Sequence, residues 1–129
     1  MASQPTPTPT ELRVSKDRRM LTVRFSHDEA YELGAELLRV ESPSAEVQGH
    51  GPEQKITVHG KRNVEILKIE PVGNYAVRIT FDDMHNTGIF SWSFLREIGR
   101  DREKRMEDYL AALEAKGLSR DPVVLPRRS

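Results

Sequence analysis

The stretch Gly73-Asn74-Tyr75-Ala76-Val77-Arg78-Ile79-Thr80-Phe81 carries the clearest structural signal in this 129-residue chain. From residue 75 to residue 81 every second side chain is large and apolar, and a period of two predicts a strand with one buried face. Because the alternation is more regular here than anywhere else in the chain, we expect this strand to lie centrally in a sheet. Pro71, Gly73 and Asn74 predict a turn immediately before it.

Strand patterns lie on both sides of this stretch. Residues 64–69 predict a strand whose apolar face changes phase between Ile66 and Leu67, which indicates a bulge. Residues 87–92 predict another strand, bent at Gly88. Near the amino terminus, two alternating runs at residues 12–14 and 21–25 predict a β-hairpin.

Helix signals follow the hairpin and end the chain. Ser26 and Glu29 have the spacing of a capping box, which predicts a helix from there to about Arg39. Ser93 is expected to cap a short helix, and Asp101 a final helix that Gly117 ends. We therefore predict an α+β fold: a small mixed or antiparallel β-sheet with an N-terminal hairpin, one helix after it and a C-terminal helix.

The chain has room for one folded domain with two tails. Residues 1–10 end in a Pro-Thr repeat and predict a disordered leader, residues 11–120 form the domain, and residues 121–129 form a tail. Residues 41–55 are rich in proline, glycine and serine and predict a long, mobile loop.

Charge and cysteine content narrow the choice of partners and compartment. Twenty basic residues balance twenty acidic ones, so we expect no nucleic-acid partner and no binding to an anionic membrane surface. The chain has no cysteine, which excludes disulfides and thiolate metal sites. No apolar stretch is long enough to span a bilayer, and the amino terminus does not have the pattern of a signal peptide, so a cytoplasmic location is expected.

The search for catalytic motifs favours a protein that is not an enzyme. Nucleophile elbow, Walker loop and dinucleotide fingerprint are all missing from the sequence. Asp82, Asp83 and His85 are the one polar cluster beside the central strand, and they have two interpretations. They are suitable ligands for a hard cation, with Glu46 or His50 from the long loop as a further ligand, or they serve only the geometry of a turn.

Several strings resemble one known family across the whole expected domain. They are Leu38-Arg39 followed by Ser42-Pro43-Ser44-Ala45, Gly73 through Ile79, and Phe81 through His85 leading into Thr87-Gly88-Ile89-Phe90-Ser91-Trp92. Together they resemble the N-terminal domain of γ-butyrobetaine hydroxylase and its short bacterial relatives.

The resemblance implies a fold that normally holds a structural zinc ion. The positions of its three cysteines and one histidine correspond here to Ser42, Ser44, Val47 and His85. Since one imidazole with neutral hydroxyls cannot hold zinc, we expect no metal and no cofactor. Met84 replaces a glycine common in the family, and it would be strained if that turn requires a positive φ.

Two classes of function remain. The favoured hypothesis is a non-catalytic binding module that docks on a partner protein or on a second copy, since the resembling domain helps subunits associate. We expect its interaction site at Phe90, Trp92 and Phe94, three aromatic residues in five positions. The alternative is a small metal-binding protein, or an accessory factor in metal or iron–sulfur delivery, that uses Asp82, Asp83 and His85.

Overall fold

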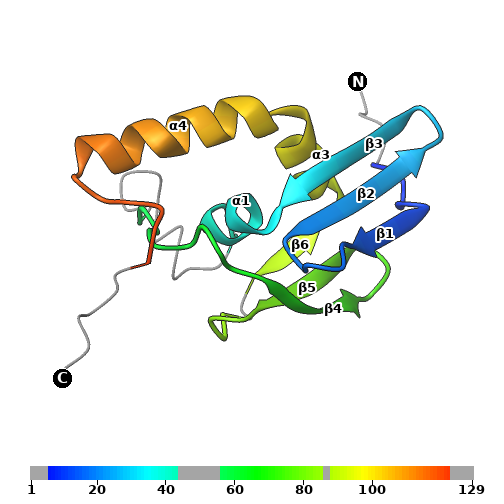
Figure 1. Ribbon diagram of the computed structural model, residues 1–129. Coiled ribbons are helices and arrows are strands. Elements are labelled where there is room, and N and C mark those ends of the chain that lie inside the picture. Colours follow the sequence, from blue (N-terminus) through cyan, green and yellow to red (C-terminus); the bar gives the residue numbers. More distant parts are fainter. Residues whose placement is uncertain (1–5, 44–55, 86–87, 123–129) are drawn as a thin grey trace.

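The computed structural model describes residues 6–43, 56–85 and 88–122 (Figure 1). The elements in chain order are β1 (Glu11–Val14), β2 (Met20–Ser26), β3 (Glu29–Gly34), α1 (Ala35–Val40), β4 (Ile66–Val72), β5 (Ala76–Phe81), β6 (Ile89–Ser91), α3 (Trp92–Arg100) and α4 (Arg102–Ala115). The strands form two antiparallel sheets with orders β1-β2-β3 and β4-β5-β6. The predicted α+β class is confirmed, with two small sheets in place of the single sheet that we expected.

The predicted hairpin forms the first two strands of the first sheet. The side chains of Leu21, Val23 and Phe25 in β2 are buried, as the alternating pattern requires. Arg18 lies in the turn between β1 and β2, and its guanidinium donates to the carbonyl oxygens of Ile66 (3.2 Å) and Leu67 (3.0 Å). The hairpin turn therefore ties the first sheet to the start of β4.

The helix predicted from Ser26 is wrong in its first half. Residues 29–34 form strand β3, and only Ala35–Val40 is helical. Ser26 Oγ accepts a hydrogen bond from the amide of Asp28 (3.3 Å) in the β2–β3 turn and caps no helix. Leu33 lies opposite Leu21 in the ladder and is fully buried. The free edge of β2 and the burial of Leu33 thus decide the structure, against the local helix signal.

The second sheet confirms the expected central strand. β5 lies between β4 and β6, and the β4–β5 register shifts between Ile66 and Lys68, which is the predicted bulge. The prediction that Tyr75 belongs to the buried face of this strand is wrong: Tyr75 lies in the turn before β5, and 56% of its surface is exposed. The opposite face of β5 is partly covered: Ala76 and Thr80 are buried there, and Arg78 between them is exposed.

The two C-terminal helices follow the predicted order with one shifted cap. Ser91, two residues earlier than predicted, caps α3, since its Oγ accepts a hydrogen bond from the amide of Phe94 (3.1 Å). Asp101 precedes α4 as expected, although its side chain makes no capping hydrogen bond. Gly117 adopts a φ of 66° and follows the end of α4, as predicted.

The residues after α4 fold back onto the segment before β4. The amide of Gly60 donates to the carbonyl of Ser119, and the amide of Arg62 donates to the carbonyl of Arg120, both at 2.9 Å. Figure 1 shows this C-terminal segment leaving the end of α4 and passing the chain that leads into β4. Within the described residues, no helix combines the length and apolar character needed to cross a membrane.

Close packing of α3 against β3 makes Gly99 sensitive to substitution. A Cβ atom at Gly99 would lie 2.4 Å from Cγ of Tyr31. We predict that Gly99→Ala lowers the free energy of unfolding by about 1–3 kcal/mol, measured by urea denaturation, because the Tyr31 ring must move. Gly34→Ala is the control, since a Cβ there meets no atom within 4 Å. Equal losses in the two variants would contradict this account.

Candidate functional site

Ser42 and His85, two of the four positions at which the resemblance implied a lost zinc site, contact each other directly. Ser42 follows α1 and His85 follows β5, and Ser42 Oγ lies 2.9 Å from His85 Nε2 in a hydrogen bond. Both residues are buried, with exposed fractions of 0% and 6%. Ser44 and Val47 lie outside the described residues, as does most of the loop at residues 41–55 that we expected to be mobile.

The donor atoms at this position do not suit zinc. A serine hydroxyl is neutral, whereas structural zinc sites use thiolate and imidazole ligands. The packing around the hydroxyl is also tight, because a Cβ atom at Gly88 would lie 2.4 Å from Ser42 Oγ. In the described part of the chain, no three His, Asp or Glu side chains are grouped to hold a metal ion.

The alternative ligands point to separate partners. Asp82 Oδ1 accepts a hydrogen bond from the amide of Glu65 (3.0 Å), which joins the turn to the start of β4. Asp83 Oδ2 lies 2.8 Å from Arg39 Nε and 2.6 Å from Lys61 Nζ. Asp82, Asp83 and His85 therefore do not converge on a common point, and the turn interpretation accounts for the contacts of both carboxylates.

Asp83 is held in its ionised form by this arrangement. Burial alone would raise its pKa, but hydrogen bonds from Lys61, Arg39 and the amide of His85 lower the pKa from 3.8 to about 2. An ionised carboxylate shared by two cations joins three segments: the end of α1, the residues before β4 and the turn after β5. Its role in this structure is to hold the turn that carries His85.

The predicted strain at Met84 is present. Met84 adopts a φ of 68°, in the left-handed region that favours glycine, and its side chain is 72% exposed. The exposed side chain makes no contribution to the core that would offset the backbone cost.

The three aromatic residues of the expected interaction site lie at different depths. Phe90 is fully buried and belongs to the core. Phe94 is half-buried and stacks on it, with ring centroids 6.0 Å apart. Trp92 is also half-buried, and its indole N–H donates to the carbonyl of Asn74 (2.9 Å). Only Trp92 and Phe94 therefore reach the surface.

Sequence reasoning missed Tyr75, which extends this aromatic surface. A shallow hollow of about 270 Å³ is formed by Tyr75 and Trp92 together with Thr6, Ser91 and Ser93; we call it the aromatic hollow. The signal was available in Gly73 and Asn74, because a turn that includes residue 75 removes Tyr75 from the inward face of the strand. The regular alternation of apolar residues from Tyr75 to Phe81 concealed this turn signal.

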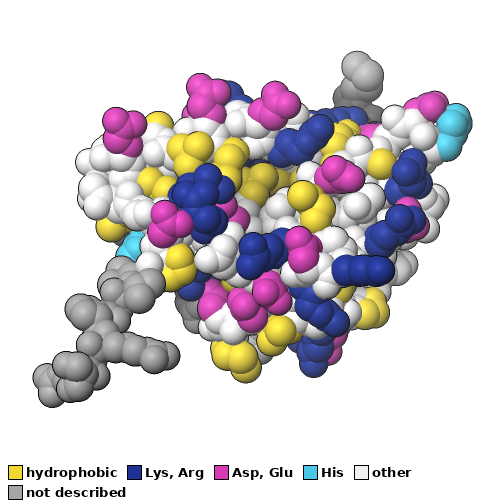
Figure 2. All heavy atoms as spheres, in the orientation of Figure 1, with side chains coloured by type: hydrophobic (Ala, Val, Ile, Leu, Met, Phe, Trp, Pro, Cys, Tyr) yellow, Lys and Arg dark blue, Asp and Glu magenta, His cyan; other side chains and the backbone are white. Residues whose placement is uncertain are grey.

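A second hollow lies between α1 and the first turns of α4. It has a volume of about 410 Å³, its floor includes Gly34, Leu37 and Met106, and four arginines line it: Arg19, Arg62, Arg102 and Arg120. We call it the arginine groove. Figure 2 shows hydrophobic side chains below α4 with Lys and Arg side chains beside them.

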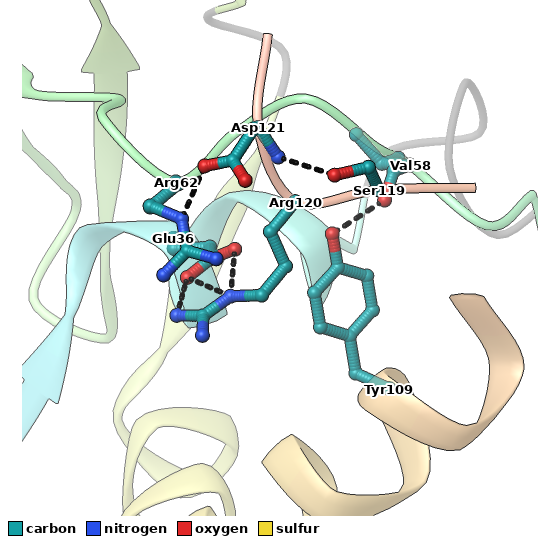
Figure 3. Close-up of polar contacts among 7 residues, drawn as sticks. All are labelled: Glu36, Val58, Arg62, Tyr109, Ser119, Arg120 and Asp121. Carbon is teal, nitrogen blue, oxygen red and sulfur yellow. Dashed lines mark hydrogen bonds and ion pairs between the residues drawn. The ribbon is translucent and has the colours of Figure 1, made fainter. Parts of the chain in front are cut away.

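A partly buried ion pair between Arg120 and Glu36 lines the arginine groove (Figure 3). Arg120 donates to both carboxylate oxygens of Glu36, with Nη2–Oε1 at 2.6 Å and Nε–Oε2 at 3.0 Å. Next to it, Tyr109 donates its hydroxyl proton to the carbonyl of Val58 (2.7 Å). Burial, together with the charge of Glu36, raises the pKa of Tyr109 to about 12. The Arg120 contacts fasten the C-terminal segment to α1, and the Tyr109 contact fastens α4 to the segment before β4.

The two antiparallel sheets and the helices, with Ser42 and His85 paired where α1 and β5 end, define a small α+β domain. The family model "Gamma-butyrobetaine hydroxylase-like, N-terminal" matches residues 12–96, and the chain belongs to this family. No match is found among curated proteins.

Solved structures of similar proteins support the fold over its full length. Two solution NMR structures are similar, one with 40% identity and a TM-score of 0.81 over 97% of this chain and 98% of that chain. The other has 41% identity and a TM-score of 0.79 over 100% and 99%. A crystal structure from Acidithiobacillus ferrooxidans, of a DUF971-family protein of unknown function, has 38% identity and a TM-score of 0.61 over 75% and 98%.

Relief of the strain at Met84 should stabilise the protein. We predict that Met84→Gly raises the free energy of unfolding by about 0.5–1 kcal/mol, because glycine adopts a positive φ without steric cost while it loses more chain entropy on folding. Thermal or urea denaturation measures the change. Met84→Ala keeps the Cβ atom and should give no such gain, and an equal gain in both variants would contradict a backbone cause.

Asp83 should make stability depend on pH in the acid range. Its folded pKa lies below its unfolded value of 3.8, so its contribution is present above pH 4 and is lost as the pH falls towards 2. The wild type should lose free energy of unfolding as the pH falls from 4 to 2, and we predict that this loss is smaller by about 1 kcal/mol in Asp83→Asn. The value is reduced to allow for solvent screening. Asp28→Asn, at a side chain that is 82% exposed, is the control. Identical pH profiles for wild type and Asp83→Asn would contradict the role of this ion pair.

Proposed function

We propose that this protein is a non-catalytic binding module that docks, through the aromatic hollow, on a partner protein or on a second copy of itself. The observation that carries the proposal is the exposure of Tyr75: more than half of a large aromatic side chain is open to solvent beside Trp92. Exposed aromatic anchors of this kind bury much area on binding at a low cost in conformational entropy.

The rigidity of the hollow supports the same proposal. Trp92 is fixed by its hydrogen bond to the carbonyl of Asn74, and its amide donates to the carbonyl of Tyr75 (3.1 Å). The two aromatic residues are therefore joined through the backbone of the turn that precedes β5. A preorganised surface loses little entropy when a partner binds.

The polar residues favour binding over catalysis. Ser42 and His85 are buried and bonded to each other, and Asp83 is neutralised by Arg39 and Lys61. A nucleophile or base needs access to its substrate, which a buried pair does not offer. Metal delivery through Asp82, Asp83 and His85 has less support, since these side chains diverge. A cytoplasmic location remains part of the proposal and rests on composition alone.

The proposal predicts a specific loss on truncation of Tyr75. Tyr75→Ala should change the free energy of unfolding by less than about 0.5 kcal/mol, because the side chain is exposed. It should weaken association by about 2 kcal/mol or more, as expected for a central aromatic anchor. Sedimentation velocity over a range of concentrations measures self-association, and capture of partners by the immobilised protein measures the other mode.

Leu67→Ala is the matched control, since Leu67 is another exposed apolar residue, 43% exposed, at the β4 bulge. It should leave both forms of association unchanged. If the wild type stays monomeric at every concentration and Tyr75→Ala captures the same proteins as the wild type, the proposed surface is wrong.

A further inference from the structure

The floor of the arginine groove is apolar and open. Leu37 and Val64 are buried there, and Met106 of α4 is half-buried. Gly34 also lines the groove, and a Cβ atom at this position would meet no atom within 4 Å. Its φ of −68° and ψ of 144° are extended values that any residue adopts. Neither backbone geometry nor packing requires glycine here, and its effect is to leave the floor of the groove unfilled.

The rim of the groove has guanidinium groups with free donors. Arg120 binds Glu36 through Nε and Nη2, so its Nη1 is outside that pair. Arg62 pairs with Asp121 through Nε at 2.5 Å, and both side chains are well exposed. Such exposed pairs contribute about 0–1 kcal/mol and exchange readily for another carboxylate. Among the described residues, the Arg19 guanidinium has no ion pair and donates no hydrogen bond.

The arginines of the lining offer donors to an anion. Four arginines and three glutamates (Glu32, Glu36 and Glu103) line the groove; Arg120 pairs with Glu36 and Arg62 with Asp121 at the exposed rim, and the Arg19 guanidinium has no ion pair among the described residues. Guanidinium groups bind carboxylates through paired, charge-assisted hydrogen bonds. An apolar floor below these donors suits a hydrocarbon body attached to the carboxylate.

We propose that the arginine groove binds a small carboxylate with a short apolar body. Its volume of about 410 Å³ lies within the range of small-molecule sites. The arginine groove is separate from the aromatic hollow, so this proposal does not depend on the proposed docking function.

The first test is a titration of isotope-labelled protein with hexanoate, followed by amide and methyl NMR shifts. Saturable shifts are expected at residues 34–37, at Val64 and at the Met106 methyl group. Hexanamide has the same body without the charge, and it should bind at least about tenfold more weakly, because it loses the charge-assisted hydrogen bonds. Equal binding of the two probes, or no saturable shift at these residues, overturns the proposal.

Variants of the groove make the test specific. Gly34→Leu places a side chain in the open floor and should abolish the hexanoate shifts, while Gly34→Ala should retain most of the affinity. The double variant Arg19→Gln with Arg62→Gln should weaken hexanoate binding by about tenfold or more. Arg78→Gln, at an exposed position on β5 outside the groove lining, is the control and should bind like the wild type.

Thermal melting of each variant separates binding from folding. The Gly34 and arginine variants are expected to melt within a few degrees of the wild type, since these side chains lie on the surface or in open space. If folded Gly34→Leu binds hexanoate as well as the wild type, the ligand lies elsewhere and the proposal is wrong. If an acidic peptide binds the groove and hexanoate does not, the small-ligand assignment is also wrong.

Discussion

Burial of the central strand β5 is the constraint on which the rest of this structure depends. Val77, Ile79 and Phe81 are buried on one face, and Ala76 and Thr80 are buried on the other, where Arg78 between them is exposed. Such a strand needs neighbours at both edges and covering layers on both sides, which β4, β6, the first sheet and the helices supply. The turns at the two ends of β5 then determine which side chains lie at the surface beside it. The turn before β5 exposes Tyr75, and the turn after it places Asp83 and His85.

Local patterns in the sequence predicted the parts of the fold that local geometry controls. The bulge after Ile66 and the positive φ at Gly117 each follow from one or two residues, whereas the strain at Met84 was predicted from the family resemblance. The failure lay at residues 29–34, where apolar spacing was compatible with a helix as well as a strand. The free edge of β2 decided between them, because a tight turn after Ser26 brings Glu29 back to pair with it, and the capping-box interpretation of these two residues concealed that turn.

The candidate sites could be predicted only where a family resemblance supplied distant contacts. Ser42 and His85 are 43 positions apart, and only the resemblance placed them together. Glu36 and Arg120 are 84 positions apart, and neither residue type nor spacing indicates that they pair. The arginine groove therefore had no signal in the sequence. Its walls come from the first sheet, α1, α4 and the C-terminal segment, which meet only in the folded protein.

The arginine groove combines features that stability alone does not explain. The ion pair of Glu36 with Arg120 takes a buried carboxylate out of water, with exposed side-chain fractions of 8% and 28%, and this desolvation offsets part of the Coulombic gain. Gly34 gives up side-chain packing at a position where an added Cβ atom would meet nothing within 4 Å. Departures from the most stable choice are expected at functional sites, where geometry is retained for another purpose. Two such departures in one groove make this surface, rather than the buried Ser42 and His85, the better place to look for a ligand.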